Sequence, residues 1–192
     1  MSRFLSGLLG YVFVFLVGLG AGLWLAGESQ PAGAVAQPDT LLRVVDGDSV
    51  VVPGVLNTDQ DVRLLDIDAP ERGQPFADRA RAEVERLCLG ARVQLDTRDG
   101  ARSTDGYGRL LAQLRCDGVY VNRHLVEQGL AWVSDRYNED PELVVVEREA
   151  EAACRGLWRD PDAVPPWVHR GRVIDGERVR PRGLCRRTAR AG

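Results

Sequence analysis

The chain has 192 residues, of which 44% are hydrophobic and 28% are charged, so it is long enough for one well-packed domain with peripheral segments and too short for two ordinary domains. Its net charge of −3 excludes the binding of nucleic acid through a uniform attraction of the whole surface. All 25 basic residues are arginines, so every cationic contact to a phosphate group has to come from a guanidinium.

The N-terminal region begins with an apolar segment of about 23 residues, which is long enough to cross a membrane as a helix. Arg3 precedes it, which favours an orientation with the rest of the chain outside the cytoplasm. The alternative is a cleaved signal peptide with Ala34-Val35-Ala36 as the cleavage site. The sequence therefore predicts a single-pass cell-membrane protein or a secreted or periplasmic one, with a short cap (1–3), an anchor or signal peptide (4–26) and a flexible linker (27–40).

The next part of the chain alternates short β-branched runs with turn residues and amphipathic segments. The runs predict five strands, over residues 41–45, 49–52, 62–67, 92–97 and 109–115. Three helices are predicted over residues 75–89, 121–128 and 141–155, each with a glycine just after its end. This order of strands and helices predicts an α+β fold, in which helices cover a small closed sheet.

Four cysteines, Cys88, Cys116, Cys154 and Cys185, agree with export to an oxidising compartment. Their spacings fit no zinc motif, so disulfides are favoured over a metal site, and free buried thiols are the alternative. Three pairings are possible, and the sequence does not choose between them.

Charged residues gather at three of the predicted turns and strand ends. Two carboxylates from separate strand ends, together with a backbone carbonyl, make a site of hard oxygens that suits Ca²⁺. A further carboxylate can act as a general base toward water, and two arginines can bind the oxygens of a phosphodiester. Taken singly, each group has a structural explanation as a turn or a salt bridge. The three groups are Asp46-Gly47-Asp48-Ser49, then Arg63 with Asp66, Asp68 and Glu71, and then Asp105 to Arg109; Asp66 and Asp68 are expected on one face of a strand.

Five segments in the same order resemble the staphylococcal nuclease family. They are Arg43–Val50, Val62–Glu71, Asp105–Ala112, Val121–Ala131 and Gly156–Trp158. The resemblance covers roughly residues 41 to 167. It implies a mainly β, α+β fold: a five-stranded OB-fold barrel with three helices over residues 41–168, preceded by the hydrophobic helix and followed by an Arg-rich tail over 169–192.

The resemblance also implies a role for individual side chains. The catalytic residues are Arg63, Glu71 and Arg109, with Glu71 as the general base and the two arginines on the phosphate. Asp48, Asp68 and the backbone carbonyl of Ala69 hold Ca²⁺, and Tyr107 and Tyr137 are expected to bind substrate. Gly106 and Asp135 stand where the family's prototype has a lysine and a stacking tyrosine, which weakens the expected positioning of substrate. The tail carries eight arginines from Arg170 to Arg190, which either supply compensating phosphate contacts or are simply solvated.

Together these features predict a Ca²⁺-dependent nuclease that cleaves DNA and RNA with little sequence specificity. It is expected to be a monomer, to contact the membrane through its N-terminal helix and to have no protein partner. One alternative is a catalytically weak OB-fold module that binds nucleic acid or a protein at the membrane surface. Another is a membrane-tethered assembly factor whose domain is only a scaffold.

Overall fold

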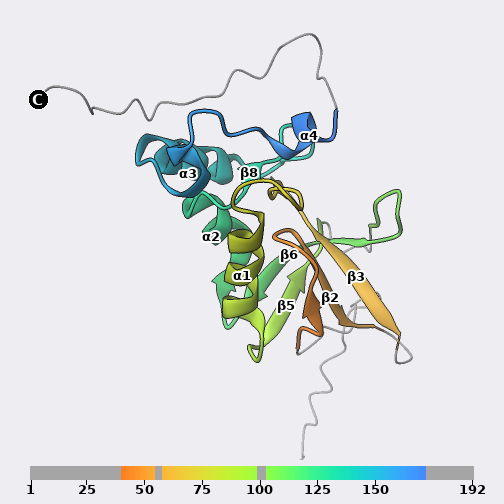
Figure 1. The fold of residues 1–192 in the computed structure, drawn as a ribbon. Helices are drawn as coiled ribbons and strands as arrows, with labels where there is room; N and C mark the ends of the chain where they lie inside the picture. Colours follow the sequence, from red (N-terminus) through yellow and green to blue (C-terminus); the bar gives the residue numbers. More distant parts are fainter. Residues whose placement is uncertain (1–39, 55–57, 99–102, 172–192) are drawn as a thin grey trace, which may run out of the picture. The chain divides into compact units, whose positions relative to one another are not determined.

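A computed structural model describes residues 40–54, 58–98 and 103–171 (Figure 1). The predicted anchor, most of the linker, Cys185 and the tail beyond residue 171 lie outside these ranges. Within them, no helix combines the length and the apolar character that a membrane span requires. The strands are β1 (Arg43–Val44), β2 (Ser49–Pro53), β3 (Asp59–Leu64), β4 (Ile67–Asp68), β5 (Val93–Asp96), β6 (Leu110–Cys116), β7 (Val119–Tyr120) and β8 (Trp132–Val133). The helices are α1 (Ala77–Cys88), α2 (Val121–Glu127), α3 (Pro141–Ala152) and α4 (Pro166–His169), with a 3₁₀ turn at Gly156–Arg159.

The main sheet has the strand order β1-β2-β3-β6-β5, and β7 adds to β6. Its pairs are antiparallel except β3 with β6, which run parallel and place Arg63 opposite Leu111. The prediction of a mainly β, α+β fold is confirmed. Among the described residues, however, the two edge strands β1 and β5 do not pair with each other, so the sheet is not closed into a barrel.

The core lies between one face of the sheet and the helices. Helix α1 buries Ala80, Val84 and Cys88, which are spaced four residues apart and so lie on one face of the helix. Strand β6 buries every second side chain, as a strand with one face toward the core does. Helices α2, α3 and α4 lie toward the end of the domain at which α1 begins (Figure 1). The loops that leave the strands at this end are therefore covered by helices.

A disulfide joins Cys88 at the end of α1 to Cys116 at the end of β6. Both residues are buried, and the bond closes a loop with a sequence separation of 28 residues. A cross-link of this span stabilises the folded state by about 3–4 kcal/mol, mainly by restricting the unfolded chain. The prediction of a disulfide is confirmed for this pair, and none of the cysteines in the described ranges is a free thiol.

The predicted strand over residues 62–67 is interrupted. Asp66 has φ of 66°, a left-handed conformation in which a strand cannot continue, so β3 ends at Leu64 and a separate strand β4 begins at Ile67. Strand β4 pairs with β8, which places Asp68 opposite Trp132. The expectation that Asp66 and Asp68 share one face of a strand was therefore wrong, because the turn at Asp66 breaks the alternation.

Candidate active site

The turn between β1 and β2 is pressed against the end of β4 and the start of α1. A Cβ atom at Gly47 would lie only 2.7 Å from the Cβ atoms of Ala69 and Ala80, so only glycine permits this approach. The backbone N–H of Ala69 then donates to Oδ2 of Asp48 at 2.6 Å. Two segments that are 21 residues apart in the sequence are thereby joined at the residues predicted to bind a metal.

Arg63 lies between the two buried aspartates. Its Nη2 atom is 3.2 Å from Oδ2 of Asp48 and 3.0 Å from Oδ1 of Asp68. Its Nη1 atom donates to the carbonyls of Leu64 at 2.9 Å and Ile67 at 3.1 Å, which fixes the guanidinium in place. One cation therefore sits between the two carboxylates and is held there by the backbone of the strand end.

Burial disfavours the ionised form of both Asp48 and Asp68. It raises the pKa of Asp48 to about 6, although the charge of Arg63 opposes the shift. It also raises the pKa of Asp68, where the hydrogen bond from Arg170 opposes the shift and the charge of Asp48 adds to it. A carboxylate in this position is stabilised by any cation that approaches it, because burial has removed its water.

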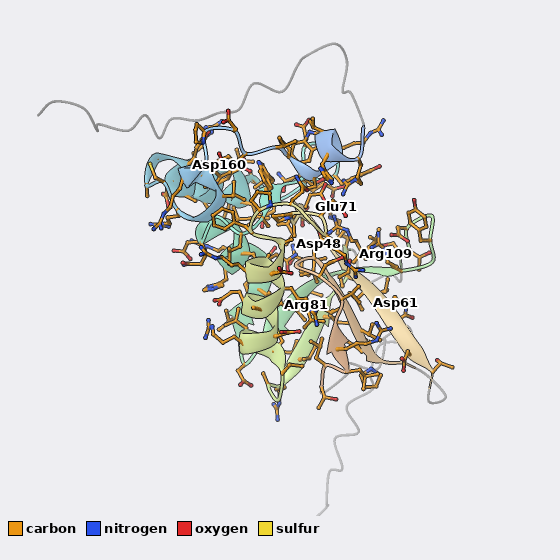
Figure 2. The ribbon with its side chains drawn as sticks, in the orientation of Figure 1. Asp48, Asp61, Glu71, Arg81, Arg109 and Asp160 are labelled. Atoms are coloured by element: carbon orange, nitrogen blue, oxygen red, sulfur yellow. A yellow bond between two sulfur atoms is a disulfide. The ribbon has the colours of Figure 1, made fainter. Side chains whose placement is uncertain are left out.

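Glu71 lies on the turn that follows β4, and 37% of its side chain is exposed. Its backbone N–H donates to Oε1 of Gln74 at 2.8 Å, which holds the turn. Its Oε1 atom accepts a hydrogen bond from Nη1 of Arg170. Arg170 also contacts Asp68, with Nη2 at 2.6 Å from Oδ2 and Nη1 at 3.3 Å from Oδ1. Figure 2 shows Asp48, Glu71 and Arg109 near one another.

Arg109 immediately precedes β6 and is linked to Asp48 by the hydroxyl group of Ser49. Its Nε atom donates to Oδ2 of Asp105 at 2.7 Å, and its Nη1 atom donates to Oγ of Ser49 at 3.2 Å. The Ser49 hydroxyl in turn donates to Oδ1 of Asp48 at 3.2 Å. The ring of Tyr107 lies 5.6 Å from the Arg109 guanidinium and is 83% exposed. Arg109 and Tyr107 thus form the solvent side of the site.

Asp66 contacts a different set of residues from those predicted to bind the metal. Its buried carboxylate accepts hydrogen bonds from Arg98, from Nε2 of Gln113 at 3.3 Å and from the backbone N–H of Glu139 at 2.9 Å. Arg98 also forms an ion pair with Glu139 at 2.9 Å and donates to the carbonyl of Tyr137 at 3.3 Å. Asp66 therefore anchors the loop that carries Tyr137. The side chain of Tyr137 is exposed, and within the described part of the chain it forms no hydrogen bond with Asp48, Asp68 or Glu71.

Replacing Asp66 with Asn is expected to lower the free energy of unfolding by about 1.5–3 kcal/mol. The amide retains one acceptor oxygen but loses the charge that pairs with Arg98. Urea denaturation monitored by circular dichroism measures this loss, and hydrogen exchange should increase across residues 134–139. Asp61→Asn, at an exposed position on β3, is the control and should change stability by less than about 0.5 kcal/mol. An equal effect of the two substitutions would contradict the anchoring role.

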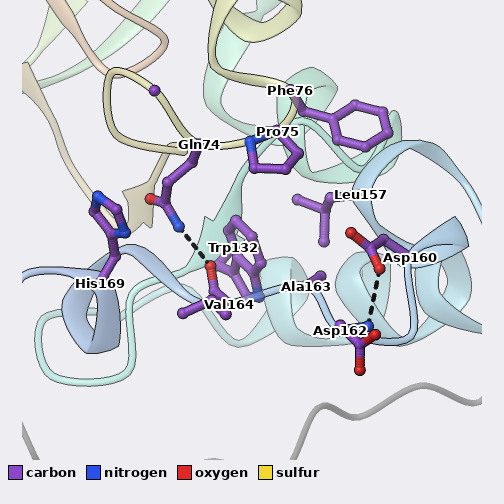
Figure 3. Close-up of a pocket in the computed structure, with 11 residues that line it drawn as sticks. Gln74, Pro75, Phe76, Trp132, Leu157, Asp160, Asp162, Ala163, Val164 and His169 are labelled. Carbon is purple, nitrogen blue, oxygen red and sulfur yellow. Dashed lines mark hydrogen bonds between the residues drawn. The ribbon is translucent and has the colours of Figure 1, made fainter.

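A pocket of about 150 Å³ lies behind the Glu71 turn and is mostly lined by apolar groups, including Phe76, Trp132 and Leu157 (Figure 3). Gln74 lines it and donates to the carbonyl of Val164 at 2.8 Å. None of the predicted catalytic or metal-binding residues lines this pocket. It lies between the Glu71 turn and the C-terminal segment, and the hydrogen bond from Gln74 joins the two.

The donor atoms suit a hard divalent cation, although they are not arranged as a finished metal centre. In the described ranges, no three His, Cys, Asp or Glu side chains converge closely enough to hold a metal ion. The carbonyl of Ala69 accepts no hydrogen bond from any described residue, while Asp48 and Asp68 are buried and share one arginine. Two carboxylates and a free carbonyl fit Ca²⁺, with water or substrate completing its coordination.

Comparison with known proteins identifies the family to which this chain belongs. A family model described as "Staphylococcal nuclease homologue" matches residues 61–160, just over half of the chain. The chain belongs to the staphylococcal nuclease homologue family. As a member it is a nuclease, a hydrolase of phosphodiester bonds. The matched range includes Arg63, Asp68, Glu71 and Arg109, whereas Asp48 lies before its start.

Three relatives show how far the similarity extends. An "Uncharacterized endonuclease" of Escherichia coli O157:H7 is 39% identical over 133 residues, which are 69% of this chain and 84% of that protein. "Protein ParB" of Escherichia coli is 37% identical over 141 residues, covering 68% of this chain and 77% of the relative. A "Micrococcal nuclease" of Shigella flexneri is 36% identical over 141 residues, covering 68% and 78%.

Proposed function

We propose that this nuclease depends on Ca²⁺ and hydrolyses DNA and RNA with little sequence specificity outside the cytoplasm. The observation that carries the proposal is the meeting of Arg63, Asp48 and Asp68, with Glu71 and Arg109 bordering them. These residues come from separate segments of the chain. The family match supports the nuclease activity, and the donor atoms support the choice of metal.

Asp48, Asp68 and the carbonyl of Ala69 would hold Ca²⁺, which when bound supplies positive charge beside the scissile phosphate. Asp48 and Asp68 are buried, whereas the side chain of Glu71 is 37% exposed, so water reaches it. Glu71 accepts a proton from the attacking water as its oxygen forms a bond to phosphorus. The bond from phosphorus to the leaving oxygen then breaks, and that oxygen takes up a proton from solvent.

Arg63 and Arg109 stabilise the negative charge that develops on the phosphate. Both guanidinium groups carry fixed charge, and each is oriented by contacts with its own neighbours, Arg63 by two carbonyls and Arg109 by Asp105. Tyr107, exposed beside Arg109, offers a ring face to a nucleobase, and Tyr137 offers a second one. Contacts of this kind do not distinguish one base from another, in agreement with little sequence specificity.

The proposal extends to the finer features of the chain. Residues 41–168 are proposed to form the nuclease domain, and the protein is proposed to be a monomer. The apolar run over residues 4–26 supports a membrane anchor or a signal peptide. The Cys88–Cys116 disulfide supports an oxidising compartment.

Cleavage of labelled single-stranded DNA and RNA by the purified full-length protein tests the proposal. Activity with Ca²⁺ is expected to fall at least 100-fold when EDTA is added, and to return when Ca²⁺ is restored in excess. Parallel reactions with Mg²⁺ and Mn²⁺ measure the metal preference. Equal cleavage in EDTA would contradict the role of Ca²⁺. A folded protein that binds the strands without cleaving them would favour a binding module instead.

A further inference from the structure

We propose that Arg170 is a displaceable counter-cation, which holds Asp68 and Glu71 in the metal-free protein and has to leave them when Ca²⁺ binds. It deepens the proposed function and rests on the same carboxylates being the Ca²⁺ site. Arg170 lies about 100 residues from both partners in the sequence, and nothing in its local sequence marked it as a contact of these residues.

The first argument is that guanidinium groups already occupy lone pairs on the carboxylate oxygens of Asp68. Both oxygens of this buried carboxylate already face a guanidinium: Oδ1 contacts Arg63 at 3.0 Å and Arg170 at 3.3 Å, and Oδ2 contacts Arg170 at 2.6 Å. Three of its roughly four lone-pair sites are thus engaged, two of them by Arg170, and a metal ion needs lone pairs of the same oxygens. Arg170 and Ca²⁺ therefore compete directly for Asp68.

The second argument is charge. Asp48, Asp68 and Glu71 carry −3 when ionised, and Arg63 and Arg170 carry +2, so this group of five side chains has a net charge of −1. Adding Ca²⁺ with both arginines in place gives +1, whereas adding Ca²⁺ in place of Arg170 gives 0. Because two of the carboxylates are buried, an excess charge is costly, and the exchange is favoured over simple addition.

The third argument distinguishes the two arginines. Arg63 donates to two backbone carbonyls besides the carboxylates, so it stays anchored when the carboxylates turn to a metal. In the described ranges, the side chain of Arg170 donates only to Asp68 and Glu71. Arg170 therefore loses all of these side-chain partners when Ca²⁺ takes the carboxylates, and of the two it is the one that leaves.

The fourth argument is that the fold delivers Arg170 to this position. It follows α4 directly, and its backbone N–H donates to the carbonyl of Pro166 at 2.9 Å. The segment before α4 is fastened to the active-site turn by the hydrogen bond from Gln74 to Val164. Trp167 packs against the buried aromatic cluster around Trp132. Residues 160–171 therefore form a packed segment that holds the Arg170 guanidinium against the carboxylates of Asp68 and Glu71. The contact is fixed by the folding of this segment onto the domain.

Isothermal titration of full-length protein with CaCl₂ alone, at fixed pH and salt, tests the exchange without relying on activity. Arg170→Gln is expected to bind Ca²⁺ about 10- to 100-fold more tightly than the wild type, because no charge-assisted hydrogen bonds have to be broken. Arg72→Gln is the matched control: it removes the same charge beside Glu71 from an exposed side chain that makes no hydrogen bond or ion pair with the described residues. Its Kd should change by about twofold or less.

Affinities of Arg170→Gln that are no tighter than those of Arg72→Gln overturn the exchange and leave the calcium proposal intact. Failure of the wild type and both variants to bind Ca²⁺ would overturn the calcium proposal and this inference with it. Circular dichroism checks that each variant is folded. If Arg170→Gln does not fold, Arg170→Lys, which keeps the charge and loses the fork, should still bind Ca²⁺ severalfold more tightly than the wild type. Unchanged affinity in that variant overturns the inference.

Discussion

Replacing Glu71 with Gln is expected to lower the rate of phosphodiester hydrolysis by about 10²- to 10⁴-fold, which is the usual contribution of a positioned general base. The amide has the size of the carboxylate but cannot accept the proton of the attacking water. Single-turnover cleavage of labelled single-stranded DNA at saturating Ca²⁺ measures the chemical step without the contribution of binding.

The effect should be confined to catalysis, because the Glu71 side chain is partly exposed and its backbone contact with Gln74 is unaffected. The thermal midpoint of the variant should stay within a few degrees of that of the wild type. Glu149→Gln, at an exposed position of α3, is the control and should cleave at the wild-type rate. A loss of less than tenfold in the folded Glu71 variant would remove this residue as the base.

Replacing Gly129 with Ala is expected to lower the free energy of unfolding by roughly 3–5 kcal/mol. The residue has φ of 64°, and an added Cβ would lie 2.3 Å from the carbonyl oxygen of Arg155. Gly156 faces it, with φ of 50° and its own Cβ position 2.1 Å from the carbonyl oxygen of Gly129. Backbone strain and overpacking therefore act together, and neither neighbour is a flexible side chain that can move aside.

Gly118 separates these two causes. It has φ of 81°, and nothing lies within 4 Å of a Cβ built at this position. Gly118→Ala therefore carries only the cost of the left-handed conformation, about 1–2 kcal/mol. Urea denaturation of the two variants side by side gives the difference, and equal losses would contradict the close approach of Gly129 and Arg155.

The sequence was sufficient to predict the positions of those site residues that lie in a recognisable local pattern. Turn residues flanked by β-branched runs located Asp48, Arg63 and Arg109 at strand ends, and the structure brings them together. Their catalytic and metal-binding roles remain predictions. The family resemblance, rather than periodicity, supplied the type of fold.

What the sequence could not show depends on contacts between distant segments. Asp66 was expected on the same face as Asp68, because nothing in the residues themselves signals a left-handed turn inside an apolar run. Strands β4 and β8 have two residues each, so only their pairing defines them. Arg170 reaches Asp68 through α4, a helix of four residues that is too short to show a period.

The parallel pairing of β3 with β6 has a consequence for how this nuclease tolerates change. The ladder from Val62–Leu110 to Leu64–Ala112 fixes the register of β3 against β6, and with it the spacing of the backbone at Arg63 and at the start of β6. The chain between β5 and β6 takes no part in that ladder. It nevertheless includes Asp105, which holds the guanidinium of Arg109, so a change of length between these two residues is expected to move Arg109. A shift of one residue in β6 would turn its core-facing side chains outward.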